Sequence, residues 1–228
     1  MAEVSRRGAF FDLEKTLTPH AVEQVTALEF HRRGELSLAQ ILRVIWIYVR
    51  YDLGFIADFD AMKRSGAPVF GGRDAARDVL VFRDYFETHL RPAIYPDALA
   101  AVRAHQAAGD EVYLISATYG FMVEPYAALL GTTGWRGTTL EVVEGRCTGR
   151  ITGIIPHQEK KAELVRDIAR DRGLDLALSA AYGDSMNDVA MLSAVGHPFV
   201  VNPGKKLARL AADRGWATLR WTSPSSAR

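Results

Sequence analysis

Three carboxylates in this sequence stand where the chain leaves short apolar runs. Asp12 follows the run 9–11, and Asp184 follows the run 178–182, with Asp188 four residues later. Short uninterrupted apolar runs are typical of strands buried on both faces of a parallel sheet, and ligands bind at the carboxyl ends of such strands. Three carboxylates gathered there would hold one hard cation, and Mg²⁺ is commonly shared between carboxylates and a phosphate. Taken singly, Asp184 also fits a helix cap and Asp188 a solvated charge.

A hydroxyl and a lysine are the other candidates for chemistry. Ser116 follows the predicted strand 111–115, and its hydroxyl and the neighbouring backbone N–H groups suit a phosphate oxygen. Lys161 lies at the start of the helix predicted over 158–173, where a fixed cation would neutralise a nucleophile and a transferring phosphoryl group. Lys160 competes for that role. The plain alternatives are a helix cap for the serine and a surface charge for the lysine.

The elements that must position these residues fall into two kinds. Strands alternate with helices after about residue 92, which predicts an α/β fold with a doubly wound, mostly parallel sheet. Residues 21–90 show no strand alternation and predict an inserted all-helical cap. Its helices are expected over 21–33, 38–51, 55–64 and 73–90.

The two patterns divide the chain into a core and an insert. We expect an α/β core over 1–18 and 92–222, a helical cap over 19–91, and a disordered tail over 223–228. Further strands are expected over 140–143, 150–154, 199–201 and 217–221. The cap is rich in aromatic side chains, which we expect to form mainly its own core; they are Phe30, Trp46, Tyr48, Tyr51, Phe55 and Phe59.

Composition bounds the partners. The 228 residues carry a formal charge of +1, which gives no field to draw nucleic acid or an anionic membrane. The apolar stretch 41–49 is interrupted by Arg43 and is too short to span a bilayer. Cys147 is the only cysteine, so no intramolecular disulfide forms, which fits a reducing compartment. We therefore expect a cytoplasmic protein with no nucleic-acid partner and no stable membrane association, and the oligomeric state stays open.

In order along the chain, these segments resemble the four motifs of the haloacid dehalogenase superfamily. They are the stretch 12–16 (DLEKT), Ser116, Lys161 and the stretch 183–188 (GDSMND). The helical insert between the first two motifs is similar to the cap of the phosphoserine-phosphatase-like branch. The resemblance covers almost the whole chain and implies a Mg²⁺-dependent phosphatase that acts on a small phosphate monoester.

The resemblance also implies a role for each matched residue. Asp12 would attack phosphorus and carry an aspartyl-phosphate, and Glu14 would protonate the leaving group and then activate water. Asp12, Asp184 and the backbone carbonyl of Glu14 would bind Mg²⁺. Ser116, Ala117 and Lys161 would bind the phosphoryl group, and Lys161 fits the motif register better than Lys160. The supporting residues would be Thr16, Ser185, Asn187 and Asp188.

Two positions depart from the family pattern. The family phosphatases have aspartate where this chain has Glu14, and a misplacement of about 1 Å costs on the order of 100-fold in rate. Phosphoserine phosphatases carry a cap glutamate nine residues after the nucleophile, where this chain has Ala21, with Glu23 out of register. The sequence therefore does not favour phosphoserine as the substrate. Two alternatives stay open: phosphotransfer to an acceptor other than water, and a phosphate- or metal-binding protein weakened in catalysis by Glu14.

Overall fold

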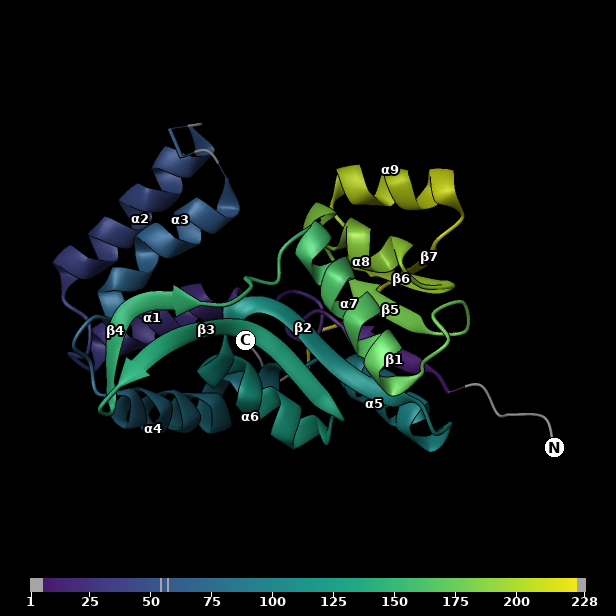
Figure 1. The fold of residues 1–228 in the computed structure, drawn as a ribbon, viewed down its shortest axis with the longest axis horizontal. Coiled ribbons are helices and arrows are strands. Elements are labelled where there is room, and N and C mark those ends of the chain that lie inside the picture. Colours follow the sequence, from purple (N-terminus) through teal and green to yellow (C-terminus); the bar gives the residue numbers. More distant parts are fainter. Residues whose placement is uncertain (1–5, 54, 57, 225–228) are drawn as a thin grey trace.

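The computed structural model describes residues 6–53, 55–56 and 58–224, with the side chains of residues 51 and 52 left aside. Its centre is a seven-stranded sheet in the order β4-β3-β2-β1-β5-β6-β7 (Figure 1). The strands are β1 (Gly8–Phe11), β2 (Glu111–Tyr119), β3 (Gly134–Val143), β4 (Arg146–Thr152), β5 (Ala180–Gly183), β6 (His197–Val201) and β7 (Ala217–Leu219). All neighbouring strands run parallel except β3 and β4, which form an antiparallel pair. The predicted α/β fold with a mostly parallel sheet is confirmed.

The first strand, β1, lies in the middle of the sheet. Its four residues are all buried, and it pairs with β2 on one side and β5 on the other. Phe10 packs on one face with Tyr113, while Phe11 packs on the opposite face with Tyr182. An apolar run without polar alternation is what a strand needs when both faces are covered.

Helices cover both faces of this sheet (Figure 1). One face packs against residues of α7 (Glu159–Arg172), α8 (Val189–Ser193) and α9 (Lys205–Arg214). The other packs against α5 (Pro96–Ala107) and α6 (Gly120–Leu130). The helices α6, α7 and α9 each end at a glycine with a left-handed backbone, which is the commonest way for a helix to stop.

Between β1 and α5, the named elements of the described residues are all helices or helical turns. They are α1 (Val22–Arg32), α2 (Leu38–Asp52), α3 (Phe59–Gly66), the 3₁₀ helix η1 (Ala67–Phe70), α4 (Ala75–Tyr85), a π-helical turn (Phe86–Leu90) and the 3₁₀ turn η3 (Arg91–Ala93). The predicted helix over 55–64 begins too early, because Asp58 is extended and caps α3 by accepting a hydrogen bond from the Ala61 N–H.

The helical segment also touches the antiparallel hairpin of the sheet. The Arg64 guanidinium donates to the carbonyls of Ile151 and Gly153 at 2.8 and 3.1 Å, and the Cys147 N–H donates to the Arg73 carbonyl at 2.9 Å. Hydrogen bonds therefore connect the helical segment to the β3–β4 hairpin. The division into a core over 1–18 and 92–222 and a cap over 19–91 stays a prediction.

Several strand bounds differ from those predicted. The strand predicted over 111–115 continues to Tyr119, so Ser116 lies inside β2 and not at its end, at a register irregularity between Ile115 and Tyr119. The strand predicted over 140–143 begins earlier, at Gly134, and the strand predicted over 150–154 runs from Arg146 to Thr152. The two form the β3–β4 hairpin, in which burial alternates along β4 but not along β3. Of the predicted tail, Ser223 and Pro224 carry no regular secondary structure, and residues 225–228 lie outside the described residues.

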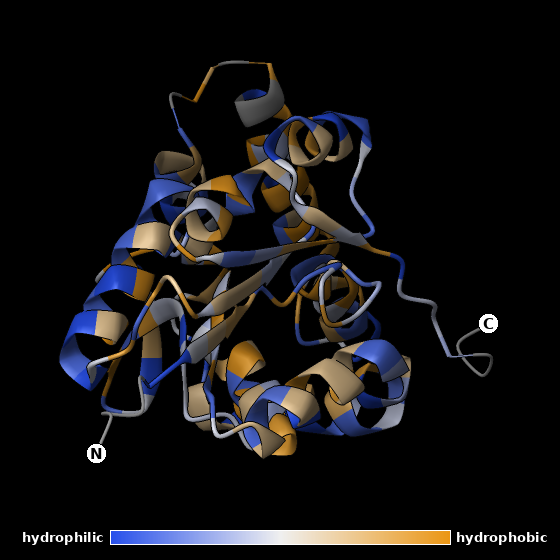
Figure 2. Cartoon of the chain, turned by 90° about the vertical axis from the view of Figure 1, so that its right-hand side faces the viewer, coloured by the Kyte–Doolittle hydropathy of each residue, from blue (hydrophilic) through white to orange (hydrophobic). Residues whose placement is uncertain are grey.

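The cap aromatics do not all form a core. Phe30 is buried as predicted, but Trp46 is 60% exposed and Phe55 is 72% exposed, so the prediction is wrong for these two. Trp46 belongs to an outer face of α2 that is apolar, whereas Figure 2 shows blue, hydrophilic residues on the outer turns of many other helices. Tyr51 lies among the side chains left aside. Within the part of the chain that the structure describes, no helix is both long and apolar enough to cross a bilayer.

Candidate active site

Asp12 lies one residue beyond β1, at the carboxyl edge of the sheet. Its backbone N–H donates to the Tyr182 carbonyl of β5 at 3.0 Å, which extends the strand pairing by one step. The side chain is almost fully buried, and the Thr16 hydroxyl donates to its Oδ2 at 3.1 Å. The strand thus fixes the position of the carboxylate, and the hydrogen bond from Thr16 fixes its orientation.

Lys161, in the first turn of α7, reaches this carboxylate from the opposite side. Its Nζ lies 2.5 Å from Asp12 Oδ1 and 2.6 Å from Asp188 Oδ1, and all three side chains are buried. Burial by itself lowers the pKa of a lysine, but here Asp12 and Asp188 raise the pKa of Lys161 above its ordinary value. Lys160 is exposed and lies 3.9 Å from Glu163, so the structure separates the two candidate lysines.

Asp184 and Asp188 bring two more carboxylates to Asp12. One carboxylate oxygen of each of the three lies within 4.8 Å of the others. Gly183 is required for this approach, because a Cβ at that position would lie 2.4 Å from the Asp188 Cβ. The Asp188 Oδ2 accepts from the N–H and hydroxyl of Ser185, at 3.1 and 2.9 Å, in a capping box.

The carboxylates of Asp188 and Asp184 differ in how many hydrogen bonds they accept from the rest of the chain. Both oxygens of Asp188 accept hydrogen bonds, from Lys161 and Ser185, whereas no hydrogen bond or close ion pair is found for the Asp184 carboxylate within the described residues. Burial and the nearby Asp12 and Asp188 raise the pKa of Asp184 to about 8. Burial also raises the pKa of Asp12 to about 6, against the opposing charge of Lys161. Crowded oxygen donors that resist losing their protons are a donor set that fits a hard divalent cation.

Glu14 points toward the helical segment. The N–H of Glu23, at the start of α1, donates to Glu14 Oε1 at 3.0 Å. Burial, followed by the neighbouring carboxylate of Glu23, raises the pKa of Glu14 to about 7. A carboxyl group with this pKa exchanges a proton readily near neutral pH, as a general acid and base must.

Ser116 and Ala117 are both present in the same pocket. The Ser116 hydroxyl is buried and donates to Thr118 Oγ1 at 3.0 Å, while the Thr118 N–H donates back to it at 3.3 Å. The Ala117 carbonyl is engaged by the Thr138 hydroxyl at 2.6 Å, on the side of β3. Thr118 was not singled out from the sequence, because the strand was expected to end before it.

The structure brings all the predicted site residues into or against one cavity of about 230 Å³. Thr16 does not line the cavity itself but contacts Asp12, which does. Asn187 lines the cavity and is exposed. Lys15, which follows Glu14, is exposed and has a left-handed backbone with φ of 57°. The sequence pattern of 12–18 does not by itself require that backbone conformation.

The cavity also has a wall that sequence reasoning missed. It is formed by side chains of the helical segment and one histidine of the core: Ala21, Glu23, Gln24, Tyr48, Phe59, Lys63 and His157. Lys63 Nζ is paired with Glu23 and lies 4.2 Å from the centre of the Tyr119 ring. Phe59 and His157 stack with ring centres 3.8 Å apart, which joins α3 to the segment before α7 beside the cavity. Glu23 was set aside on its register, yet it lies in this wall.

The sequence of this chain is similar to that of known proteins. Residues 9–193 match the haloacid dehalogenase-like hydrolase family. The phosphoserine phosphatase SerB1 of Mycobacterium tuberculosis is 34% identical over 216 residues, which are 92% of this chain and 69% of that protein.

Two solved structures are similar in fold. A protein of unknown function from Bordetella pertussis Tohama I has a TM-score of 0.86 and 31% identity, over 95% of this chain and 99% of that one. A phospho-aspartyl intermediate analogue of phosphoserine phosphatase has a TM-score of 0.67 and 19% identity, over 90% of each chain. At that identity the second likeness concerns the fold alone.

Proposed function

The chain belongs to the haloacid dehalogenase-like hydrolase family, and on that premise we propose that Asp12 is the nucleophile of this phosphatase. The observation that carries the proposal is the contact of Lys161 with both Asp12 and Asp188, at 2.5 and 2.6 Å in a buried site. A buried cation beside Asp12 keeps the carboxylate ionised, and it offsets the negative charge of an incoming phosphate.

The proposed reaction has two steps. An oxygen of Asp12 attacks phosphorus, the bond from phosphorus to the ester oxygen breaks, and Glu14 gives its proton to the departing alkoxide. The ionised Glu14 then takes a proton from a water molecule that attacks the same phosphorus. The bond between phosphorus and Asp12 breaks, inorganic phosphate leaves, and both side chains return to their starting states.

Other residues of the chain hold the phosphoryl group during these steps. Ser116 would donate its hydroxyl to a phosphoryl oxygen once that hydroxyl turns from Thr118, and the Ala117 N–H would serve a second oxygen. Lys161 adds a fixed positive charge in a site where little water screens it. Ser185 and Asp188 keep Lys161 and the loop after β5 in place through their own hydrogen bonds.

We propose Mg²⁺ as the metal, held by Asp12, Asp184 and the backbone carbonyl of Glu14. The support is that oxygens of Asp12 and Asp184 lie within 4.8 Å of each other, and that no hydrogen bond or close ion pair is found for Asp184 among the described residues. A divalent ion there would supply positive charge beside the phosphoryl oxygens. Asp188 would act by orienting Lys161 and Ser185 and would not itself bind the metal.

The proposed substrate class is a small phosphate monoester. Phosphoserine is not the favoured member, because the Glu23 carboxylate that lies in the pocket wall already accepts from Lys63 and from the Tyr119 N–H. A carboxylate so engaged does not offer a free negative charge to the amino group of a substrate. The cytoplasmic location stays a prediction from the sequence.

A generic aryl phosphate tests the function directly. We expect the purified protein to release phosphate from para-nitrophenyl phosphate with Mg²⁺ and to lose that activity when the metal is chelated. The matched control is Asp12→Asn, which keeps the size of the side chain and removes the nucleophile. Absence of release by the wild type with Mg²⁺, or equal release by the control, contradicts the proposal.

A further inference from the structure

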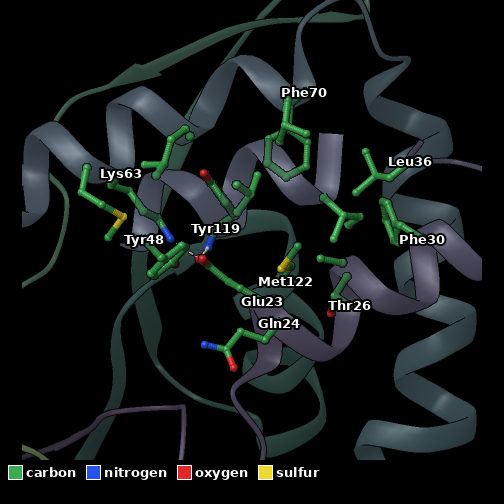
Figure 3. A pocket seen from close by; sticks show the side chains of 17 residues that line it. Glu23, Gln24, Thr26, Phe30, Leu36, Tyr48, Lys63, Phe70, Tyr119 and Met122 are labelled. Carbon is green, nitrogen blue, oxygen red and sulfur yellow. Dashed lines mark hydrogen bonds and ion pairs between the residues drawn. The ribbon is translucent and has the colours of Figure 1, made fainter. Parts of the chain in front are cut away.

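A second cavity adjoins the catalytic one inside the helical segment. It has a volume of about 90 Å³ and shares four lining residues with the catalytic cavity: Glu23, Gln24, Tyr48 and Lys63. Figure 3 shows Glu23, Tyr48 and Lys63 gathered at one end and Phe30, Leu36 and Phe70 at the other. The cavity thus has one end at the wall of the active site and one end deep in the cap.

The end beside the active site is polar but electrically balanced. The Glu23 carboxylate accepts from Lys63 Nζ and from the Tyr119 N–H, the latter at 3.2 Å, and Lys63 also lies over the Tyr119 ring. The ammonium and the backbone amide both donate to one oxygen of the carboxylate, Oε1, so the positive and negative charges are paired. This end therefore has no unpaired charge that would select a charged group on the alcohol part of a substrate.

The deep end is apolar and buried. Its walls are the side chains of Phe30, Leu36, Ile41, Met62, Val69 and Phe70. Protein interiors are close-packed, and apolar cavities large enough for a ligand stay dry and take up apolar molecules. The Thr26 hydroxyl at this depth is buried and has no hydrogen-bond partner among the described residues, and a single hydroxyl falls short of the roughly two to four polar partners that a buried water needs. Water is therefore poorly held in this cavity, and an apolar group is better suited to fill it.

We propose that the substrate of this phosphatase carries an apolar group on the alcohol side of its phosphate ester, and that this group enters the cap cavity. The inference rests on the function proposed above. The phosphoryl group lies at Asp12, and the alcohol passes Tyr48 and Lys63 into the cavity. An apolar cavity of roughly 150 Å³ accepts benzene, so about 90 Å³ suits a smaller group, a chain of about four carbons.

A series of primary alkyl phosphates from ethyl to octyl tests this length. Burial of each methylene is worth a factor of about four in kcat/KM for the wild type, and the gain ends when the cavity is full. We expect the rise to stop near butyl or pentyl phosphate. A flat series in a protein that hydrolyses ethyl phosphate overturns the inference and leaves the phosphatase assignment standing. No hydrolysis of any ester overturns the function itself, and the inference with it.

A cavity-filling variant assigns the effect to this site. Ala27 lines the cavity on α1, and Ala27→Leu should bring the ratio of kcat/KM for butyl over ethyl phosphate close to one. The matched control is Ala100→Leu, the same change at an exposed position of α5, which should keep the wild-type ratio. Equal ratios in the two variants overturn the assignment to the cavity. The wild-type series decides the inference even if Ala27→Leu does not fold.

Discussion

Replacing Lys161 by methionine removes a buried cation and keeps an unbranched side chain that is one atom shorter. Its Nζ is the partner of two buried carboxylates, Asp12 and Asp188, at 2.5 and 2.6 Å. Breaking a buried ion pair by deleting one partner costs about 3–5 kcal/mol of unfolding free energy, because the remaining charge is left without compensation. For a chain of this size the expected fall in Tm is roughly 6–20 °C, at about 2–4 °C per kcal/mol.

The loss should depend on pH in a definite direction. In Lys161→Met the cation that opposes the effect of burial is gone, so the pKa of Asp12 in the folded state rises further above that of the unfolded chain. The folded state then binds more protons than the unfolded state, so its stability is fully present at low pH and is lost as pH rises through the folded pKa. The variant should therefore be close to wild type at pH 5 and far less stable at pH 8.

Urea unfolding at pH 5 and pH 8, without added metal and with excess Mg²⁺, measures the effect. Mg²⁺ should recover part of the loss at pH 8, since a bound cation replaces some of the missing charge. The control is Lys160→Met, which removes an exposed lysine one residue earlier and should cost at most about 1 kcal/mol. An equal loss at both pH values, or a similar loss in the control, refutes the electrostatic reasoning.

Three further outcomes follow from the site. Asp12→Asn should lower phosphate release by at least about 10³-fold while circular dichroism stays unchanged, and activity within a few-fold of wild type contradicts the nucleophile assignment. In calorimetric titration, Asp184→Ala should weaken Mg²⁺ binding more than Asp188→Ala does. For Asp188→Ala, whose residue supports the ligands, we expect a loss of about 10- to 100-fold in Mg²⁺ affinity. Equal losses in the two variants contradict the proposed ligand set. Glu14→Asp should lower the turnover of alkyl phosphates by about 100-fold, and that of aryl phosphates by less, because the shorter side chain no longer reaches the Glu23 N–H. A variant that is faster than wild type shows that the pocket is not built around glutamate.

Much of the candidate site was predictable because its signals are local. Asp12 and Asp184 each follow an apolar run, and the edge where parallel strands end is shared by all of them. Lys161 was chosen over Lys160 by motif register, and the burial of Lys161 agrees with that choice. These positions depend on the order of the strands and on which side of a helix a residue lies, and both can be inferred from the periodicity of apolar residues in the sequence.

The wall of the pocket was not predictable, because it depends on how helices that are distant in sequence pack against one another. Lys63 meets Glu23 across 40 residues of chain, and no short-range pattern records that pairing. Strand β3 was predicted too short because its residues do not alternate regularly, since most of them are half-buried or exposed. The start of α3 was missed because Asp58, its cap, stands after an apolar stretch that resembles a helix.

The central place of β1 has a consequence for how the protein is made. Ala9 pairs with Ala180, so about 170 residues must be synthesised after β1 before its second neighbour, β5, exists. At about 5–20 residues per second this takes roughly 10–35 s, during which one edge of an apolar strand has no native partner on the ribosome. The step that covers this edge also delivers Asp184 to Asp12. A nascent chain therefore cannot assemble the three-carboxylate site early, and uptake of a metal ion by that site would report that the sheet has closed.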